Sequence, residues 1–285
     1  MTNNKQNLRA SSSTGHDFSE SAHLDRHFLA CQPEYEAMLK SVGLKKGWHV
    51  LDAGCGAGSF LPLMSQLVGA SGEIQALDLA PENVALVKAR QTNNEYACCV
   101  TARVGDVTKL PYADNSFDAV WCAAISQYLD DDALNVMLGE FKRVLKPGGV
   151  MGLKDVHLNT WEWQPLDPLL PSRLWSAAMV NGSPRTWQGL RGVVLPAIVR
   201  RVGFKHLRAN TVMIQRWQPL SDAERSYQSH FLPAAAALAH SYENLSDADK
   251  AVWEKVGDVT APNHMLNHPD FYFCEGHMMI VAENC

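Results

Sequence analysis

The sequence has 285 residues, 46% of them hydrophobic and 19% charged, with a formal net charge of −5 at pH 7. These values are typical of a soluble globular protein, and the acidic balance leaves no basic footprint for nucleic acid or an anionic membrane. No apolar run approaches the roughly 20 residues that cross a bilayer, and no apolar signal core opens the chain. We therefore expect a cytoplasmic protein without a membrane or nucleic-acid partner.

The seven cysteines include no C-x-x-C pair, which favours reduced thiols and predicts no metal site. The adjacent Cys98 and Cys99 could bind a metal or act in redox chemistry, but we interpret them as two small buried residues at the start of a strand.

The chain is expected to begin with a tail and two helices. Residues 1–21 are polar and rich in Ser and Asn, which predicts disorder. From Leu24 to Val42 apolar residues recur at helical spacing, and Pro33 divides the segment into two helices. We expect residues 22–285 to form one domain, although a chain of this length could hold two small ones.

A glycine-rich turn follows the first predicted strand. Residues 48–51 form a short, mostly apolar strand with Asp52 at its carboxyl end, and a helix is predicted over residues 60–67. The turn between them has the sequence Leu-Asp-Ala-Gly-Cys-Gly-Ala-Gly. Glycines let a ligand approach the backbone and accept positive φ, and the helix N-terminus adds N–H groups and partial positive charge. The spacing G-x-G-x-G differs from the dinucleotide fingerprint G-x-G-x-x-G; a turn without a ligand is the alternative.

Further strands alternate with helices along the chain. Strands are predicted over residues 73–78, 100–106, 119–124 and 150–156, with helices over 81–93 and 130–145 between them. This alternation predicts a parallel sheet covered by helices on both faces. Ligands bind such sheets beyond the carboxyl ends of the strands. Acids stand at four of these ends: Asp52, Asp78, Asp106 and Asp155.

Three elements are expected to complete the sheet and its cover. A helix is predicted from Leu190 to Val202, a sixth strand from Leu207 to Ile214, and a seventh from Phe271 to Glu283.

Three motifs resemble those of class I S-adenosylmethionine-dependent methyltransferases. The glycine-rich turn is similar to the family's first motif. The runs Leu-Pro-Tyr-Ala-Asp-Asn-Ser-Phe-Asp-Ala-Val-Trp-Cys at 110–122 and Val-Leu-Lys-Pro-Gly-Gly-Val at 144–150 resemble the segments leading into its fourth and fifth strands. The resemblance covers about residues 42–157 and the closing hairpin. It implies a Rossmann-like α/β fold: a seven-stranded, mostly parallel sheet with an antiparallel seventh strand, helices on both faces and helical lid insertions.

The resemblance implies S-adenosyl-L-methionine as cofactor and S-adenosyl-L-homocysteine as product. In the family the glycine loop passes under the methionine end. The matching acids are Asp52 near the ammonium group, Asp78 at the ribose hydroxyls and Asp106 at the adenine amino group. The full implied set is Asp52, Gly54, Cys55, Gly56, Gly58, Asp78, Leu79, Asp106, Val107 and Ala123.

Two segments exceed the minimal fold and are expected to be lids over the acceptor, at about residues 158–190 and 218–267. The first contains four tryptophans, Trp161, Trp163, Trp175 and Trp187. We expect an aromatic-lined pocket for a small organic acceptor; a larger apolar core is the alternative. Arginines near this segment could bind an acidic or diphosphate-bearing acceptor: Arg173, Arg185, Arg191, Arg200 and Arg201, the last two fitting a solvated helix face better.

Two residues are candidates for the chemistry of the acceptor. Methyl transfer needs the nucleophile held in line with the S–CH3 bond and often deprotonated. His157, just beyond the fifth strand, titrates in a suitable range for a base, although a structural histidine is the alternative. Gln127, in the loop after the fourth strand, could face the cofactor or acceptor, or cap the next helix.

We therefore predict a methyltransferase acting on C, N or O of a small, apolar or aromatic acceptor, such as a secondary metabolite or prenyl-type compound. The alternatives are a methyltransferase of tRNA or protein, and a cofactor-binding protein without catalysis. The acidic charge balance disfavours tRNA. The sequence names neither the acceptor nor the methylated atom, and it leaves a homo-oligomer open.

Overall fold

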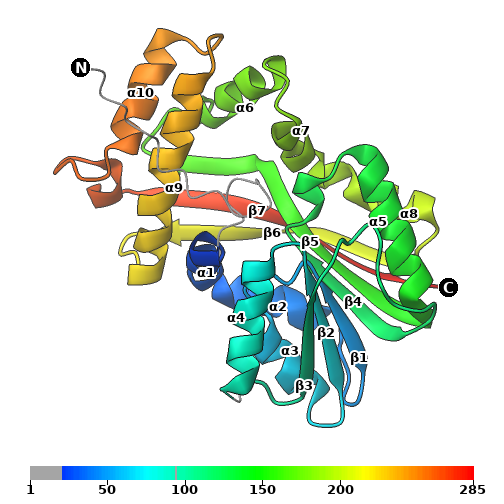
Figure 1. The fold of residues 1–285 in the computed structure, drawn as a ribbon. Helices are drawn as coiled ribbons and strands as arrows, with labels where there is room; N and C mark the ends of the chain where they lie inside the picture. The colour runs from blue at the N-terminus through cyan, green and yellow to red at the C-terminus, as the bar shows by residue number, and fades with distance from the viewer. Residues whose placement is uncertain (1–20, 94) are drawn as a thin grey trace, which may run out of the picture.

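A seven-stranded sheet organises the protein (Figure 1). The structure is a computed structural model and describes residues 21–93 and 95–285. The strands lie in the order β3-β2-β1-β4-β5-β7-β6. Their bounds are β1 His49–Ala53, β2 Glu73–Asp78, β3 Cys99–Val104, β4 Phe117–Ala123, β5 Leu145–Gln164, β6 Lys205–Trp217 and β7 Tyr272–Glu283. Strands β1 to β5 pair in parallel, and β7 is antiparallel to both β5 and β6. The predicted fold class is confirmed.

Ten α-helices lie in the described part of the chain: α1 Ser21–Ala30, α2 Gln32–Ser41, α3 Leu61–Val68, α4 Pro81–Thr92, α5 Asp131–Val144, α6 Leu170–Val180, α7 Pro184–Leu190, α8 Leu195–Val202, α9 Asp222–Ser241 and α10 Asp247–Gly257. Short 3-10 turns are η1 Ser126–Tyr128, η2 Arg191–Val194 and η3 Met265–Asn267. None of the helices described is both long and apolar enough to cross a membrane. The tail expected over residues 1–21 lies outside the described residues except for Ser21, which begins α1.

The helices cover the sheet with two apolar cores. One face packs against α5 and α8, through residues such as Phe141 and Val199. The other packs against α2, α3 and α4, and the same cluster of buried residues continues to Leu232 of α9 and Trp253 of α10. Burial of these apolar side chains is the main force that holds the helices on the sheet.

Two predicted elements are longer in the structure. Strand β5 was expected to end at Val156, but it continues to Gln164 because β7 supplies partners beyond a bulge, where Glu162 pairs with Cys274. Residues 158–164 of the first expected lid are therefore part of the sheet. The sequence of the second expected lid also predicts a helix over residues 234–242; in the structure this is the end of the 20-residue α9, whose internal Pro233 hides its continuity in the sequence.

Other expectations were partly wrong in detail. The helix expected from 190 to 202 is divided into two elements, η2 and α8, and Leu190 is the last residue of α7. Cys98 and Cys99 are not two buried residues, because Cys98 is half-buried and Cys99 is exposed. The expected single domain, residues 22–285 with two lids, stays a prediction.

The long strands divide the sheet into two regions. In Figure 1, β5, β7 and β6 run past the ends of β1 to β4 toward α9 and α10. The chain order reverses between β2-β1 and β1-β4, which makes the carboxyl ends of β1 and β4 the switch point where ligands bind in this class of sheet.

Candidate functional site

The glycine-rich turn lies at the switch point between β1 and α3. Its glycines Gly54, Gly56 and Gly58 have φ of 79°, 53° and 85°, a region that glycine adopts without strain. A Cβ on Gly54 would lie 2.3 Å from the Cδ1 atom of Ile125, so this position also needs the absence of a side chain. The N–H groups of Gly54 and Cys55 both donate to the carbonyl of Leu77, at 2.7 and 3.0 Å, which fixes the turn beside β2.

Asp52 presents a buried carboxylate atom without a partner. The residue is 2% exposed, and its Oδ2 accepts no hydrogen bond within the described residues. Burial, reinforced by the nearby charge of Asp78, raises the pKa of Asp52 to about 8. A buried carboxylate without a partner is costly when it is charged. The site therefore favours a cationic hydrogen-bond donor that would pair with it.

Asp78 has a different environment, since its carboxylate fastens the turn. Oδ2 accepts from the N–H of Gly56 at 2.8 Å. Oδ1 accepts from the N–H of Ala80 at 2.9 Å and from the side chain of Asn83 at 3.2 Å. Each carboxylate oxygen accepts about two hydrogen bonds, so Oδ2 keeps capacity for one more donor.

The remaining residues of the implied cofactor set lie around this turn on strand ends. Leu79 is 51% exposed and follows Asp78 directly. Asp106 is exposed two residues beyond β3, and its Oδ1 accepts from the N–H and hydroxyl groups of Thr108, at 2.8 and 2.7 Å. Val107 is buried, and Ala123 is half-buried as the last residue of β4. Thr108 thus fixes the orientation of the Asp106 carboxylate.

Gln127 and His157 occupy separate places. Gln127 lies in η1, where its N–H donates to Asp155 at 3.2 Å and its side chain donates to the carbonyl of Ala124 at 3.0 Å. It therefore closes the loop after β4, and the cap of α5 is Asp130 instead. The half-buried His157 has its Nδ1 3.2 Å from the hydroxyl of Thr211. Burial lowers the pKa of His157, which favours the neutral imidazole.

Two arginines suggested for an anionic acceptor are already paired. Arg191 is buried, with Nη1 2.6 Å from Asp131 and Nη2 donating to the carbonyls of Ser126 and Leu129. Arg173 bonds Asp249 at 2.8 Å and Asp167 at 2.9 Å, and so joins α6 to α10. Their guanidinium groups hold the fold, and the suggestion of an anion site is wrong for these two residues.

The tryptophans of the first expected lid are mostly core residues. Trp161, Trp163 and Trp175 are 8%, 1% and 7% exposed and pack with Phe231 and one another. Trp187 is 49% exposed. The larger apolar core, the alternative to an aromatic-lined pocket, describes the first three residues.

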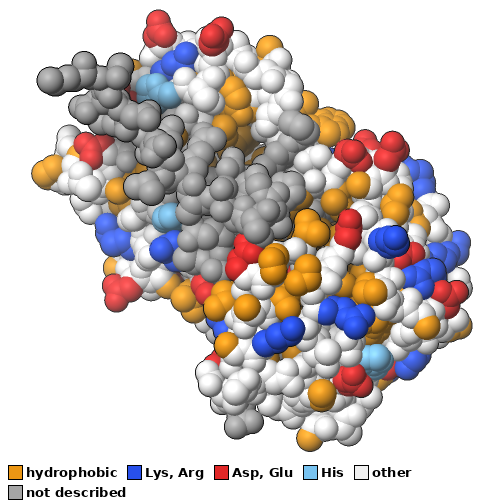
Figure 2. Space-filling model, viewed as in Figure 1, with side chains coloured by type: hydrophobic (Ala, Val, Ile, Leu, Met, Phe, Trp, Pro, Cys, Tyr) orange, Lys and Arg blue, Asp and Glu red, His pale blue; other side chains and the backbone are white. Residues whose placement is uncertain are grey.

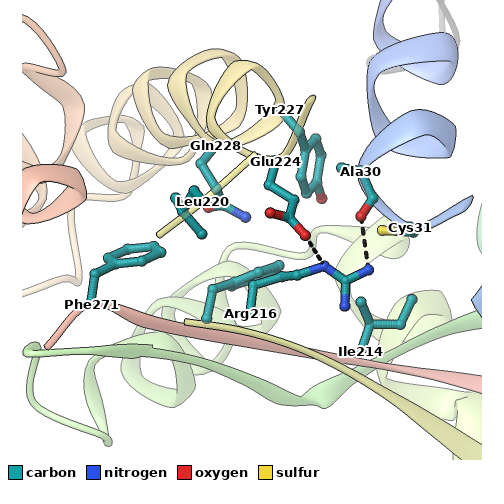
Figure 3. Close-up of a pocket in the computed structure, with 10 residues that line it drawn as sticks. Ala30, Cys31, Ile214, Arg216, Leu220, Glu224, Tyr227, Gln228 and Phe271 are labelled. Carbon is teal, nitrogen blue, oxygen red and sulfur yellow. Dashed lines mark hydrogen bonds and ion pairs between the residues drawn. The ribbon is translucent and has the colours of Figure 1, made fainter. Parts of the chain in front are cut away.

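A small pocket opens between α9 and the long strands (Figure 3). Across it Arg216 forms ion pairs with Glu34 at 2.7 Å and Glu224 at 2.5 Å, and its Nη2 donates to the carbonyl of Ala30 at 2.9 Å. The lining residues are Ala30, Cys31, Ile214, Arg216, Leu220, Glu224, Tyr227, Gln228, Phe271 and Phe273.

Beside this pocket lies a buried polar cluster that the sequence did not reveal. Glu275 is fully buried, and its Oε1 is 2.7 Å from His27 Nε2, 3.0 Å from His277 Nε2 and 3.2 Å from Cys31 Sγ. Its Oε2 accepts from the hydroxyl of Tyr227 at 3.1 Å. Burial lowers the pKa of His277 to about 3 and raises the pKa of Cys31 well above its usual value.

Tyr35 and Lys154 link this cluster to the ends of the central strands. The Tyr35 hydroxyl lies 3.0 Å from His27 Nε2 and 3.3 Å from His277 Nε2. The ammonium of Lys154 lies 3.7 Å from the centre of the Tyr35 ring. Burial lowers the pKa of Lys154 to about 8. Because Lys154 pairs with Ala123 at the end of β4, the cluster adjoins the carboxyl edge of the sheet.

Comparisons with known proteins fit this geometry. A family model described as "Methyltransferase domain" matches residues 50–149. The chain is 37% identical over 117 residues to the chloroplastic 2-phytyl-1,4-beta-naphthoquinone methyltransferase of Arabidopsis thaliana, which covers 40% of this chain and 44% of that protein. It is 36% identical over 129 residues to the malonyl-[acyl-carrier protein] O-methyltransferase of Erwinia billingiae. That alignment covers 43% of this chain and 47% of the relative. The chain thus matches less than half the length of each relative.

A solved structure extends the likeness to nearly the whole fold. Phosphoethanolamine N-methyltransferase 2 of Haemonchus contortus, in complex with S-adenosyl-L-methionine, superposes with a TM-score of 0.55 at 16% identity. The alignment covers 93% of this chain and 57% of that one. At this identity the likeness concerns the arrangement of strands and helices.

Proposed function

We propose that the chain, whose residues 50–149 match the methyltransferase domain model, is a class I S-adenosylmethionine-dependent methyltransferase that moves a methyl group from S-adenosyl-L-methionine to a C, N or O atom of a small organic acceptor. The observation that carries the proposal is Asp52, whose buried Oδ2 has no partner within the described residues beside a turn of three positive-φ glycines. Such a carboxylate accepts charge-assisted hydrogen bonds from a cation such as an ammonium group.

The residues present fit the cofactor. Asp52 would hold the ammonium group of its methionine end, with Gly54 and Gly56 beneath it. Asp78 would accept from a ribose hydroxyl with its remaining capacity, and Asp106 from the adenine amino group. The outer residues of the proposed set are Cys55, Gly58, Leu79, Val107 and Ala123. Bound there, the cofactor supplies a sulfonium methyl group that is open to attack by a nucleophile.

We propose His157 as the base or orienting group for the acceptor and Gln127 as the residue that shapes the loop facing it. His157 is half-buried, and its lowered pKa keeps the imidazole neutral and able to take a proton. The hydroxyl of Thr211, 3.2 Å from Nδ1, would hold the ring in place. The alternative is a structural role for His157, because a histidine that is hydrogen-bonded to a threonine needs no catalytic role to be stable.

The acceptor class is inferred from two sources. The relatives are named for a phytyl naphthoquinone and for a malonyl group on acyl-carrier protein, and the lining of the pocket beside α9 is partly aromatic, with Tyr227, Phe271 and Phe273. On the face shown in Figure 2, basic and acidic side chains are interspersed, which does not favour a nucleic-acid surface there. We therefore propose a small apolar or aromatic acceptor. The second relative favours one alternative, an acceptor carried on a protein.

Titration calorimetry with S-adenosyl-L-methionine tests the cofactor, comparing the wild type with Gly56→Val. The wild type should bind, and the variant should not, because a β-branched side chain resists positive φ and fills the cofactor's place. Absence of binding by a folded wild type would refute the proposal. Transfer of label from S-[methyl-³H]adenosylmethionine to a prenylated naphthoquinol, a malonyl thioester or malonyl acyl-carrier protein then separates free from carried acceptors. Tight binding with no transfer to any metabolite extract would favour a non-catalytic cofactor-binding protein.

A further inference from the structure

We propose that a divalent transition-metal ion, zinc by the chemistry of its ligands, binds to four side chains gathered where α1 meets β7: His27, Cys31, Glu275 and His277. This zinc site does not rest on the proposed methyl transfer, since the ion requires neither the cofactor nor an acceptor. The sequence predicted no metal site, because His27 and Glu275 are 248 positions apart.

The spacing of the ligands suits the two elements that carry them. His27 lies on α1 and Cys31 directly follows its last residue, Ala30. The N–H of Cys31 donates to the carbonyl of His27 at 3.2 Å, so the two residues share a helical turn. Glu275 and His277 are two positions apart on β7, so both point to the same face of the sheet. The end of α1 therefore supplies one pair of ligands, His27 and Cys31, and β7 supplies the other pair, Glu275 and His277.

The ligand atoms already converge. The Nε2 atoms of His27 and His277 and a carboxylate oxygen of Glu275 lie within 4.8 Å of one another. The contacts of Glu275 Oε1 with the histidine nitrogens are 2.7 and 3.0 Å, and its contact with Cys31 Sγ is 3.2 Å. Tetrahedral zinc, with bonds of about 2.0–2.3 Å, separates its ligand atoms by about 3.3–3.6 Å. Shifts of roughly half an ångström would therefore bring these three contacts of Glu275 Oε1 to the separations found around zinc.

The charge and burial of the four side chains suit a divalent ion. Glu275 and His277 are fully buried and Cys31 is 1% exposed, and buried charges in proteins are paired or coordinate metals. A zinc ion with one carboxylate and one thiolate is electrically neutral. Two imidazoles, a carboxylate and a thiolate form a mixed set that zinc accepts readily. On binding, the proton of the Cys31 thiol would pass to solvent, and each imidazole would stay neutral with its proton on Nδ1.

The surroundings contain the supporting contacts of a metal centre. The Tyr227 hydroxyl donates to Oε2 of Glu275 at 3.1 Å, which fixes the carboxylate. The Tyr227 ring stacks on His27 with centroids 4.5 Å apart. Cys31 and Tyr227 also line the pocket in Figure 3, so the pocket reaches the cluster and offers an ion a path of entry.

Metal analysis of the full chain tests the zinc site. Protein stripped with a chelator is dialysed against micromolar zinc, and the bound metal is measured by plasma mass spectrometry. One zinc per chain is expected. Glu275→Gln should weaken binding by about 100-fold or more, since even the loss of an outer supporting contact typically costs 10–100-fold. Wild-type protein that holds no zinc under these conditions would overturn the proposal.

A second cluster provides the matched control. His206, Glu283 and Cys285 also come together, but they are largely exposed. His206→Ala should leave the zinc content unchanged, and loss of zinc in this variant with retention in Glu275→Gln would place the metal there and refute the proposal.

Cobalt identifies the sulfur ligand. Co²⁺ in the wild type should give a thiolate charge-transfer band that Cys31→Ser removes; a wild-type complex without this band contradicts the ligand set. Zinc should also raise the melting temperature of the wild type and not of Glu275→Gln, because ligands stabilise only the state that binds them. Circular dichroism shows whether each variant is folded.

Discussion

Asp52→Asn should make the ligand-free protein more stable while weakening its affinity for S-adenosyl-L-methionine. The Asp52 side chain is buried with an unpartnered Oδ2, and burial raises its pKa from 3.8 to about 8. Above pH 4 the unfolded chain releases this proton and the native state keeps it. The free energy of unfolding therefore falls as pH rises from about 4 to about 8, and the penalty is constant above that range.

The magnitude follows from the shift in pKa. One pKa unit corresponds to 1.36 kcal/mol, so a native pKa of about 8 against 3.8 destabilises the protein by roughly 4 kcal/mol at pH 7. Asparagine removes this destabilisation by the buried carboxylate. It also buries an amide without a full set of hydrogen-bond partners, at a cost of about 1–2 kcal/mol. The net gain should be about 2–3 kcal/mol, which raises the melting temperature by about 5–10 °C in a chain of this size.

Urea denaturation of both ligand-free proteins at pH 5, 7 and 8.5 measures the effect. The difference in unfolding free energy should grow with pH up to about 8. Asp78→Asn is the control of opposite sign, because that carboxylate accepts three hydrogen bonds and its loss should destabilise the turn. A folded Asp52→Asn that is less stable than the wild type at pH 7 would refute the reasoning, since it would mean that the carboxylate has a partner in the free protein.

Three other substitutions test separate parts of the site. Gly54→Ala should destabilise the protein by more than about 2 kcal/mol because its Cβ meets Ile125. The control Gly148→Ala has a similar φ of 77° but open space around the Cβ, so it measures the backbone strain alone. Equal losses of unfolding free energy in urea for the two variants would exclude the clash. Arg191→Met should cost about 1–3 kcal/mol for each carbonyl left unpaired, whereas the exposed Arg200→Met should change the melting curve little. His157→Ala should slow methyl transfer about 10²–10⁴-fold with unchanged cofactor affinity if the imidazole is a base; an unchanged rate and pH profile would leave it structural.

The sheet was predictable because its signals are local. Strand β2 was predicted with its observed bounds, since a mostly apolar run between a glycine and a strand-end acid is short and well delimited. The antiparallel β7 followed from the resemblance to the family, and the pairing of β7 with β5 and β6 confirms it. The first depends on a pattern within a dozen residues, and the second depends on a family whose motifs lie elsewhere in the chain.

The parts that the sequence missed depend on distant partners. Strand β5 runs to Gln164 because β7 pairs with it, and nothing between residues 157 and 164 marks a strand without that partner. The cluster around Glu275 joins residues from the two ends of the chain. The local spacing of His27 with Cys31, and of Glu275 with His277, was a possible signal of a metal site. Each spacing is common in proteins, and neither one indicates that the two pairs meet in the fold.

Helix α1 connects the two proposed sites of the molecule. Asp25 accepts from the hydroxyl of Ser59, at the end of the glycine-rich turn, at 2.9 Å and lies 3.6 Å from Arg90 of α4. Two residues later on the same helix, His27 contacts Glu275 of β7. Displacement of α1 would therefore disturb both sets of contacts. An ion that strengthens the contact with β7 would bias the position of α1 and so the affinity of the turn for its ligand. Linkage requires that the ligand change the affinity for the ion by the same factor.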